Sequence, residues 1–243
     1  MADRLRNRIA WVTGAGTGIG AAAAVALAGE GALVVLTGRR REPLEATAAT
    51  IQDAGGRAEV QPADLTDSQS VAKVANLIAK RFGQLDILVN NAGVNILNRR
   101  WTELDPSGVD RVVHGNLSSA FYCAGAAIEI MRPRGEGLLI HTASMAGRLV
   151  RGVGGPAYTA AKHGVVAMSH SINLEEADNG IRSCVICPGE VDTPILDNRP
   201  VPVSAEARAK LLTAEDVGEL ILYVACQPPR VRIDEVWITP TRR

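Results

Sequence analysis

Short apolar runs alternate with longer amphipathic stretches along this chain of 243 residues. The apolar runs predict strands at 9–13, 33–37, 58–62, 86–90, 137–143, 183–187 and 235–239. The stretches between them have helical length and predict helices at 19–30, 42–54, 67–82, 108–131, 156–178 and 213–226. Nearly continuous apolar strands separated by helices are typical of a parallel sheet that is covered on both faces.

This alternation predicts an α/β fold, a doubly wound, Rossmann-like domain in which helices cover both faces of a seven-stranded parallel sheet. No repeat, low-complexity tract or break in composition marks a linker, so we expect one domain over 1–243. The irregular region is 188–212, where four prolines follow the sixth predicted strand. We expect this region to be a loop or lid rather than part of the core.

The composition excludes several classes of function. Lys plus Arg equals Asp plus Glu at 26 each, so no net field attracts the protein to nucleic acid or to a membrane surface. No apolar run approaches the length of a membrane span, and the N-terminus "MADRLRNR" lacks the apolar core of a signal peptide. We therefore expect a cytoplasmic protein.

The four cysteines invite a metal or disulfide interpretation, particularly Cys184 and Cys187 in "C-V-I-C". This segment is predicted to be a strand, on which residues i and i+3 face opposite sides of the sheet. The two sulfurs then cannot share a ligand. We expect all four cysteines to be reduced, buried thiols and expect no metal site.

A glycine-rich turn follows the first predicted strand in "T-G-A-G-T-G-I-G-A", with glycines at 14, 16, 18 and 20. Glycines allow a tight turn and close approach of the backbone, and a helix begins immediately afterwards. The first backbone N–H groups of that helix would face a pyrophosphate, so the order of strand, glycines and helix predicts a dinucleotide site. Two dinucleotide fingerprints fit, one starting at Gly16 and one at Thr13.

Tyr158 and Lys162 lie four residues apart in "Y-T-A-A-K", which places them on one face of the predicted helix. A nearby cation lowers the pKa of a phenol, and moving it from about 10 to about 7 takes roughly 4 kcal/mol. The pair is therefore a candidate acid–base device, although the same spacing also occurs on solvated helix faces.

The Thr13 fingerprint and the Tyr158–Lys162 pair belong to a larger pattern that resembles the short-chain dehydrogenase/reductase family over nearly the whole chain. "TGAGTGIG" (13–20) is similar to the cofactor turn of the family, "NNAG" (90–93) to its fourth-strand motif and "CPGEVDTP" (187–194) to its Pro-Gly motif. Ser144 lies fourteen residues before Tyr158, within a residue or so of the spacing of the family serine, and Asn116 is placed like the family asparagine. Six loose motifs in the right order are specific together.

The resemblance implies four catalytic residues. Tyr158 would exchange a proton with the substrate oxygen, and Lys162 would lower the pKa of Tyr158 and bind the nicotinamide ribose. Ser144 would polarise the substrate carbonyl, and Asn116 would complete a proton path through water. The implied activity is hydride transfer between a nicotinamide cofactor and a small alcohol or carbonyl substrate, with 188–212 as the substrate loop. The alternative is a regulatory protein that binds the cofactor without catalysis, but the catalytic set is complete.

The resemblance also implies the cofactor contacts. These are Gly14, Thr17, Gly18, Ile19, Gly20, Arg39, Asp64, Leu65, Asn91, Ala92, Gly93, Tyr158, Lys162, Pro188, Gly189, Val191 and Thr193. Family members that prefer NAD usually carry Asp at the end of the second strand, where this chain has Gly38 followed by three arginines. Arg39 can bind a 2′-phosphate with a charge-assisted fork, so NADP(H) is favoured and NAD(H) stays possible. One or two of these arginines would simply begin the next helix.

Two further expectations concern the surface. The stretch "NRRWTELD" (98–105), with Arg99, Arg100 and Trp101, fits either a substrate mouth or plain surface, and surface is favoured. The predicted helices at 108–131 and 156–178 carry small or apolar faces, and the resemblance implies that they pair with symmetry mates in a homodimer or homotetramer. The residues expected on these faces are Ala120, Ala124, Ala127, Ala157, Ala161, Val165 and Met168.

Overall fold

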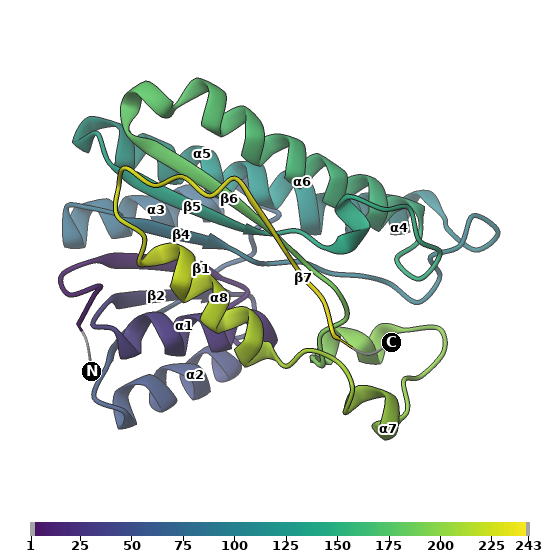
Figure 1. Ribbon diagram of the computed structural model, residues 1–243. Helices are drawn as coiled ribbons and strands as arrows, with labels where there is room; N and C mark the ends of the chain where they lie inside the picture. Colours follow the sequence, from purple (N-terminus) through teal and green to yellow (C-terminus); the bar gives the residue numbers. More distant parts are fainter. Residues whose placement is uncertain (1–2, 242–243) are drawn as a thin grey trace.

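The computed structural model describes residues 3–241, which form a single α/β domain around one parallel sheet (Figure 1). Within these residues the sheet has seven strands in the order β3-β2-β1-β4-β5-β6-β7, all parallel to their neighbours. The strands are β1 (Ile9–Thr13), β2 (Leu33–Gly38), β3 (Arg57–Pro62), β4 (Ile87–Asn90), β5 (Gly137–Thr142), β6 (Ile181–Pro188) and β7 (Glu235–Ile238). The predicted doubly wound fold is confirmed.

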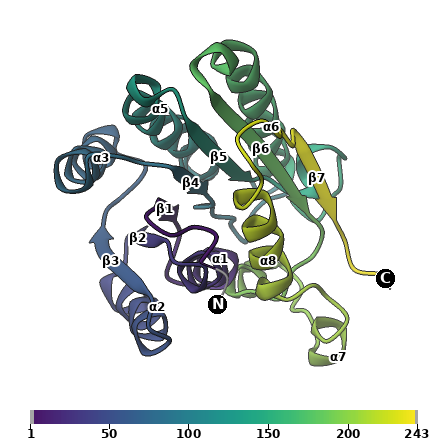
Figure 2. The same ribbon diagram turned by 60° about the vertical axis from the view of Figure 1, so that its left-hand side comes forward.

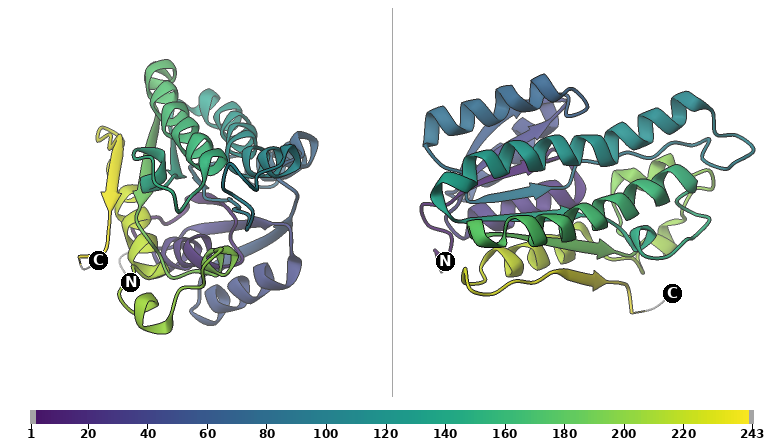
Figure 3. Two further views of the ribbon diagram at one scale, coloured as in Figure 1. Left: turned by 90° about the vertical axis from the view of Figure 1, so that its right-hand side faces the viewer. Right: turned by 90° about the horizontal axis from the view of Figure 1, so that it is seen from above.

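Helices cover both faces of the sheet, as Figures 2 and 3 show from different sides. One face carries α1 (Gly18–Gly29), α2 (Arg41–Asp53) and α8 (Ala214–Ala225), and the other carries α3 (Ser68–Phe82), α5 (Ser119–Met131) and α6 (Pro156–Glu175). Alternate strand residues feed the two cores, so Val12 packs on the α1 side and its neighbour Trp11 on the α5 side. Among residues 3–241, no helix has both the length and the apolar character that a bilayer crossing requires.

The helix starts differ in a way that matters for the site. The Asp67 side chain caps α3 by accepting from the N–H groups of Gln69 and Ser70, and Thr213 caps α8 in a reciprocal box with Asp216. At the start of α1, Thr17 makes no side-chain cap. The first N–H groups of α1 therefore receive no hydrogen bond from the Thr17 side chain.

The predicted helix 108–131 is interrupted in the structure. It consists of α4 (Pro106–Val113), a π-helical turn at His114–Ser118 and α5. The turn brings Gly115 against the preceding loop, since a Cβ on Gly115 would lie 2.6 Å from Cγ2 of Val94. The amphipathic pattern runs through the π turn and did not reveal it.

The irregular region 188–212 also contains more order than the sequence indicated. It holds a 3-10 turn at Pro194–Asn198 and the short helix α7 (Ala205–Arg208). Its two ends meet where Val191 bridges to Leu212. The proline-rich segment is therefore a folded excursion between β6 and α8.

Two expectations about buried residues have different outcomes. Cys184 and Cys187 pack into opposite cores, as predicted, while Cys226 is only partly buried. The expected interface residues on α5 and α6 are wrong as surface positions, because six of the seven are buried within the protomer. Those six are Ala120, Ala124, Ala127, Ala161, Val165 and Met168. Their small or apolar character serves the packing of α5 and α6 on the sheet.

Candidate active site

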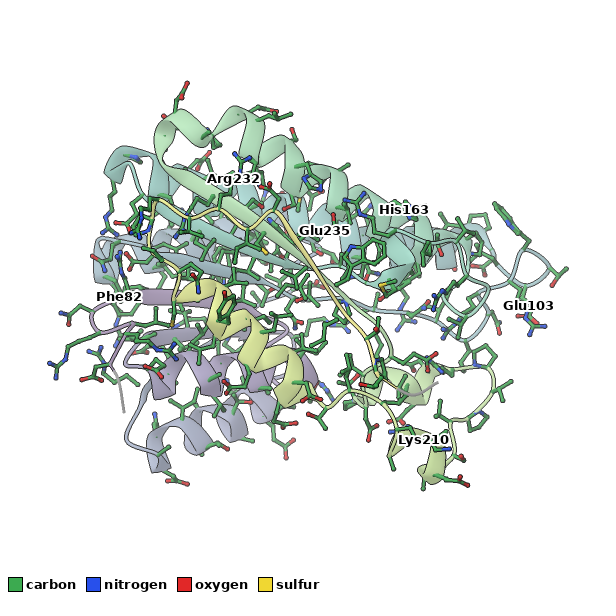
Figure 4. The ribbon with its side chains drawn as sticks, in the orientation of Figure 1. Phe82, Glu103, His163, Lys210, Arg232 and Glu235 are labelled. Atoms are coloured by element: carbon green, nitrogen blue, oxygen red, sulfur yellow. The ribbon has the colours of Figure 1, made fainter. Side chains whose placement is uncertain are left out.

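A cleft of about 720 Å³ opens at the carboxyl ends of the strands. It lies where the strand order reverses, with β2 on one side of β1 and β4 on the other, which is where open α/β sheets bind ligands. Figure 4 labels Glu103, in the loop after β4, and Lys210, in the segment before α8, which lie at the same end of the molecule as α4 and α7. The volume is in the range of small-molecule and cofactor sites.

Thr13 holds the two loops at this reversal together. Its hydroxyl oxygen accepts hydrogen bonds from the backbone N–H groups of Asn91, at 2.9 Å, and Ala92, at 3.0 Å. The adjacent Gly14 has a φ of +63°, and a Cβ there would lie 3.0 Å from the Cα of Ala92. The turn after β1 can therefore approach the loop after β4 only because residue 14 is a glycine.

The glycine turn fits a pyrophosphate. The uncapped start of α1 faces the cleft, which Thr17, Gly18 and Ile19 line. On the opposite wall Thr193 stands close, because a Cβ on Gly18 would lie 3.0 Å from Cγ2 of Thr193. Gly20 differs from the other predicted contacts: it is buried behind the turn, and a Cβ there would lie 2.2 Å from the Gly14 carbonyl oxygen. We therefore assign Gly20 to packing.

The far end of the cleft lies beside the ends of β2 and β3. Gly38, Arg39, Arg40, Asp64 and Leu65 line it. Hydrogen bonds from the Thr66 backbone and hydroxyl hold the pKa of Asp64 below its usual value, and the charge of Arg39 contributes. Arg39 itself is exposed and forms no hydrogen bond or salt bridge with the other residues described by the structure. This end can therefore receive an adenosine with an anionic group at the ribose.

Tyr158 and Ser144 lie at the other end of the cleft, on α6 and after β5. Ser144 has an extended backbone, and its Oγ accepts a hydrogen bond from the Ala146 N–H at 3.1 Å. Burial raises the pKa of Tyr158, while the Ser144 hydroxyl and the charge of Arg99 act in the opposite direction. The expectation that Lys162 lowers this pKa is not met in the protein alone. The cation that acts on the phenol is Arg99.

Lys162 is buried below Tyr158, with 4% of its surface exposed. Its Nζ donates to the Thr142 carbonyl at 2.8 Å, and burial lowers its pKa to about 8. Asn116, in the π turn, donates from Nδ2 to the carbonyls of Val94 and Val112 at 2.7 and 2.8 Å. A Cβ on Gly93 would lie 2.8 Å from Oδ1 of Asn116 and 3.5 Å from Nζ of Lys162, so the three residues converge on one point.

The structure brings the predicted site residues together in this cleft, with Gly20 behind it. Asn91, Ala92 and Gly93 line one wall, and the other wall is lined by Pro188, Gly189, Val191 and Thr193. Five arginines that were not predicted as site residues also line it: Arg40, Arg99, Arg111, Arg151 and Arg199. The surface interpretation of 98–105 holds for Arg100 and Trp101 but is wrong for Arg99, which is 6% exposed. Nothing in the pattern "NRRW" distinguishes the two arginines.

Residues 8–201 match the family model described as short chain dehydrogenase. The chain belongs to the short-chain dehydrogenase family. The 3beta-hydroxysteroid dehydrogenase of Mediterraneibacter gnavus is 35% identical over 195 residues, which cover 80% of this chain and 70% of that protein.

Two solved structures superpose on this dehydrogenase. A metagenomic short-chain oxidoreductase in complex with NADP has a TM-score of 0.86 and 31% identity, covering 99% of this chain and 100% of that one. An alcohol dehydrogenase from the archaeon Thermococcus sibiricus, complexed with 5-hydroxy-NADP, has a TM-score of 0.86 and 26% identity, with 97% of both chains covered. The protein is thus an NAD(P)-dependent short-chain dehydrogenase, an oxidoreductase that transfers hydride.

Proposed function

We propose that this dehydrogenase transfers hydride between NADP(H) and a small alcohol or carbonyl substrate, with Tyr158 as the acid–base residue. The observation that carries the proposal is the convergence of Tyr158, Ser144, Lys162 and Asn116 in one cleft beside the glycine turn. When bound, the nicotinamide supplies the hydride. Side chains of this protein would donate the proton, polarise the carbonyl and resupply the proton.

Tyr158 is the proton donor for reduction. Because burial raises its pKa, the phenol is protonated at neutral pH and has a proton to give to a carbonyl oxygen. The Ser144 hydroxyl lies beside it and would hydrogen-bond to the same oxygen, where negative charge develops as the carbonyl is reduced. In oxidation of an alcohol, the same proton would return to Tyr158.

Lys162 and Asn116 would resupply the proton. A lysine whose pKa is about 8 can release and regain a proton near neutral pH. Asn116 uses its amide N–H groups on the carbonyls of Val94 and Val112, so it would contribute its carbonyl oxygen, through water, to a path from Lys162. In the enzyme with cofactor bound, Lys162 would also hydrogen-bond to the nicotinamide ribose.

The preference for NADP(H) rests on the end of β2. A Cβ on Gly38 would make only ordinary contact, 3.5 Å from Leu44, and Gly38 carries no carboxylate that would repel a phosphate. Arg39 is exposed at the cleft and can direct its guanidinium to a 2′-phosphate. The NADP held by the metagenomic oxidoreductase supports this choice. The folded segment 188–212 would close over the cofactor through Thr193 and shape the substrate pocket.

A screen of ketones, aldehydes and alcohols with both cofactors tests the proposal. Turnover would be followed through the absorbance of the reduced nicotinamide, with Tyr158→Phe as the matched variant. Steady turnover that depends on Tyr158 is expected. Tight binding of NADPH with no turnover of any compound would instead favour the regulatory, non-catalytic alternative.

A further inference from the structure

Arg99 is a buried cation in the cleft, near Tyr158 and Ser144, where the proposed function places the substrate. It lies in the loop between β4 and α4, and its guanidinium donates to three main-chain carbonyls from three different loops. Nε donates to Ile96 at 2.6 Å and Nη1 to Val153 at 3.1 Å, while Nη2 donates to Asn198. Each Nη atom carries a second N–H group, so two of the five guanidinium N–H groups stay available.

These three bonds satisfy donors but leave the charge of Arg99 without a counter-ion. Carbonyl oxygens are neutral, and no salt bridge among residues 3–241 includes Arg99. Burial and the neighbouring charge of Arg199 both lower the pKa of Arg99. Buried charges in proteins are normally paired, because removal of an ion from water is costly. The missing partner is therefore an anion that the protein does not supply.

The other side chains that line the cleft also carry more positive than negative charge. Arg199 acts on Arg99 through its charge, and Arg111 and Arg151 also line the cleft. The lining residues include two carboxylates, Asp64 beside the ends of β2 and β3 and Glu190. Glu190 is already paired with Arg199 at 3.1 Å. The lining of the cleft is thus strongly positive although the whole chain is neutral.

Arg99 also lies beside the reacting group. It packs on the start of α6, since a Cβ on Gly155 would lie 2.9 Å from Cβ of Arg99, and Gly155 has a φ of +77°. Tyr158 follows within the first turn of that helix, and both side chains line the cleft. A small molecule can therefore contact the Arg99 guanidinium and the Tyr158 hydroxyl at the same time.

We propose that the substrate carries a carboxylate that binds Arg99, so that this enzyme interconverts short oxo acids and hydroxy acids. Two free N–H groups on a planar guanidinium match the two oxygens of a carboxylate. This inference rests on the proposed function, because it takes the substrate carbonyl to lie at Tyr158 and Ser144. Arg99 would then fix which end of the substrate faces the phenol.

A purely structural role for Arg99 predicts a different outcome and can be separated by experiment. If Arg99 only held three loops together, its replacement would change the affinity for charged and neutral ligands equally. Pyruvate, acetoacetate and levulinate would each be compared with its methyl ester for binding to the protein saturated with NADP⁺, which cannot donate hydride. Isothermal titration calorimetry would be run on wild type, Arg99→Gln, Arg99→Lys and the matched control Arg100→Gln, whose arginine is adjacent but exposed.

At least one acid is expected to bind wild type more tightly than its ester, and Arg99→Gln should reduce that advantage by roughly tenfold to a hundredfold. Arg99→Lys keeps the charge and should retain part of the advantage, while Arg100→Gln should retain all of it. Equal binding of acids and esters by wild type, equal losses for both in Arg99→Gln, or no binding of any acid at millimolar concentration would overturn the inference.

Measurements of turnover distinguish the carboxylate site at Arg99 from the proposed hydride transfer. Reduction of neutral ketones with no preference for acids would leave the hydride-transfer proposal standing and remove the carboxylate site. Tight binding of acids without reduction of any carbonyl would support Arg99 and contradict catalysis. The two proposals therefore fail in different experiments.

Discussion

The Nζ atom of Lys162 lies 5.6 Å from the centre of the Tyr158 ring. The ammonium donates a hydrogen bond to the Thr142 carbonyl, and among the described residues it forms none with the Tyr158 hydroxyl. In this arrangement the lysine does not force the tyrosine to ionise, and Tyr158 keeps its proton. The pair is poised for proton donation, the direction that carbonyl reduction requires.

Replacement of the phenol by a phenyl ring tests the role of Tyr158. Tyr158→Phe removes one hydroxyl that the cleft exposes, so the fold and cofactor affinity should persist while turnover falls by about 10²–10⁴-fold. Tyr223→Phe, at an exposed position on α8, is the matched control and should behave as wild type. Rates near the wild-type value for Tyr158→Phe would show that another group transfers the proton.

Lys162 should reduce the stability of the protein. Its pKa of 10.5 in the unfolded chain falls to about 8 on folding, so the unfolded state binds this proton more tightly. The resulting cost is fully present below about pH 8 and fades as the pH rises toward about 10.5. Lys162→Met should therefore lose activity yet be more stable near neutral pH by about 1–3 kcal/mol, with a smaller advantage at alkaline pH.

Urea unfolding of wild type and Lys162→Met at neutral and alkaline pH measures this difference. Lys80→Met, at an exposed position on α3, is the control and should show no such pH dependence. If Lys162→Met were less stable at both pH values, the hydrogen bond to Thr142 would outweigh the cost of burying the charge.

Arg39 should select the cofactor. Arg39→Ala is expected to weaken NADPH binding by roughly tenfold to a hundredfold and to leave NADH binding nearly unchanged, since NADH has no phosphate for this arginine. The preference of wild type for NADPH should shrink as salt screens the exposed charge. Gly38→Asp should act in the opposite sense by placing a carboxylate near the 2′ position.

Dissociation constants of both cofactors for these variants check the assignment. Arg41→Ala is the matched control, because Arg41 pairs with Glu45 and does not line the cleft. Equal losses for NADPH and NADH in Arg39→Ala would mean that the arginine contacts the adenosine rather than a phosphate. A wild-type preference for NADH would contradict the proposed cofactor.

The exposed apolar residues of α5 and α6 should hold protomers together. Phe121 is 52% exposed and Leu174 is 85% exposed, and they lie on the two helices that the family resemblance implies pair with symmetry mates. Sedimentation at micromolar concentration should give the mass of a dimer or tetramer, and Phe121→Lys or Leu174→Lys should lower it. Val201→Lys, at an exposed apolar position in the segment 188–212, should not. A monomeric mass for wild type would exclude the assembly.

The sequence revealed the strands well because parallel strands are buried on both faces and leave unbroken apolar runs. It revealed the glycine turn because Gly14 occupies a left-handed conformation that few residues adopt. It missed the π turn because an amphipathic pattern survives one additional residue, and Gly115 was the single local sign. The interface faces were misjudged because small residues suit a helix packed on a sheet as well as one packed on a partner.

The burial of Arg99 is a feature that the sequence pattern does not reveal. Its burial depends on loops after β4, β5 and β6 meeting around it, and the carbonyls of Ile96, Val153 and Asn198 are far apart in the chain. Arg100 has the same chemistry one residue later and points to solvent. Local sequence cannot separate the two, because the difference arises only when the three loops fold together.

The π-helical turn at His114–Ser118 limits how the chain length can vary. Removal of one residue there would restore α-helical winding and rotate α5 by about 100° relative to α4. Phe121 would then turn away from its outward position, and Ala124 would leave the core. Asn116 would lose its hydrogen bond to the Val94 carbonyl. Relatives of this protein are therefore expected to tolerate many substitutions between Val94 and Met131 but no change in the number of residues.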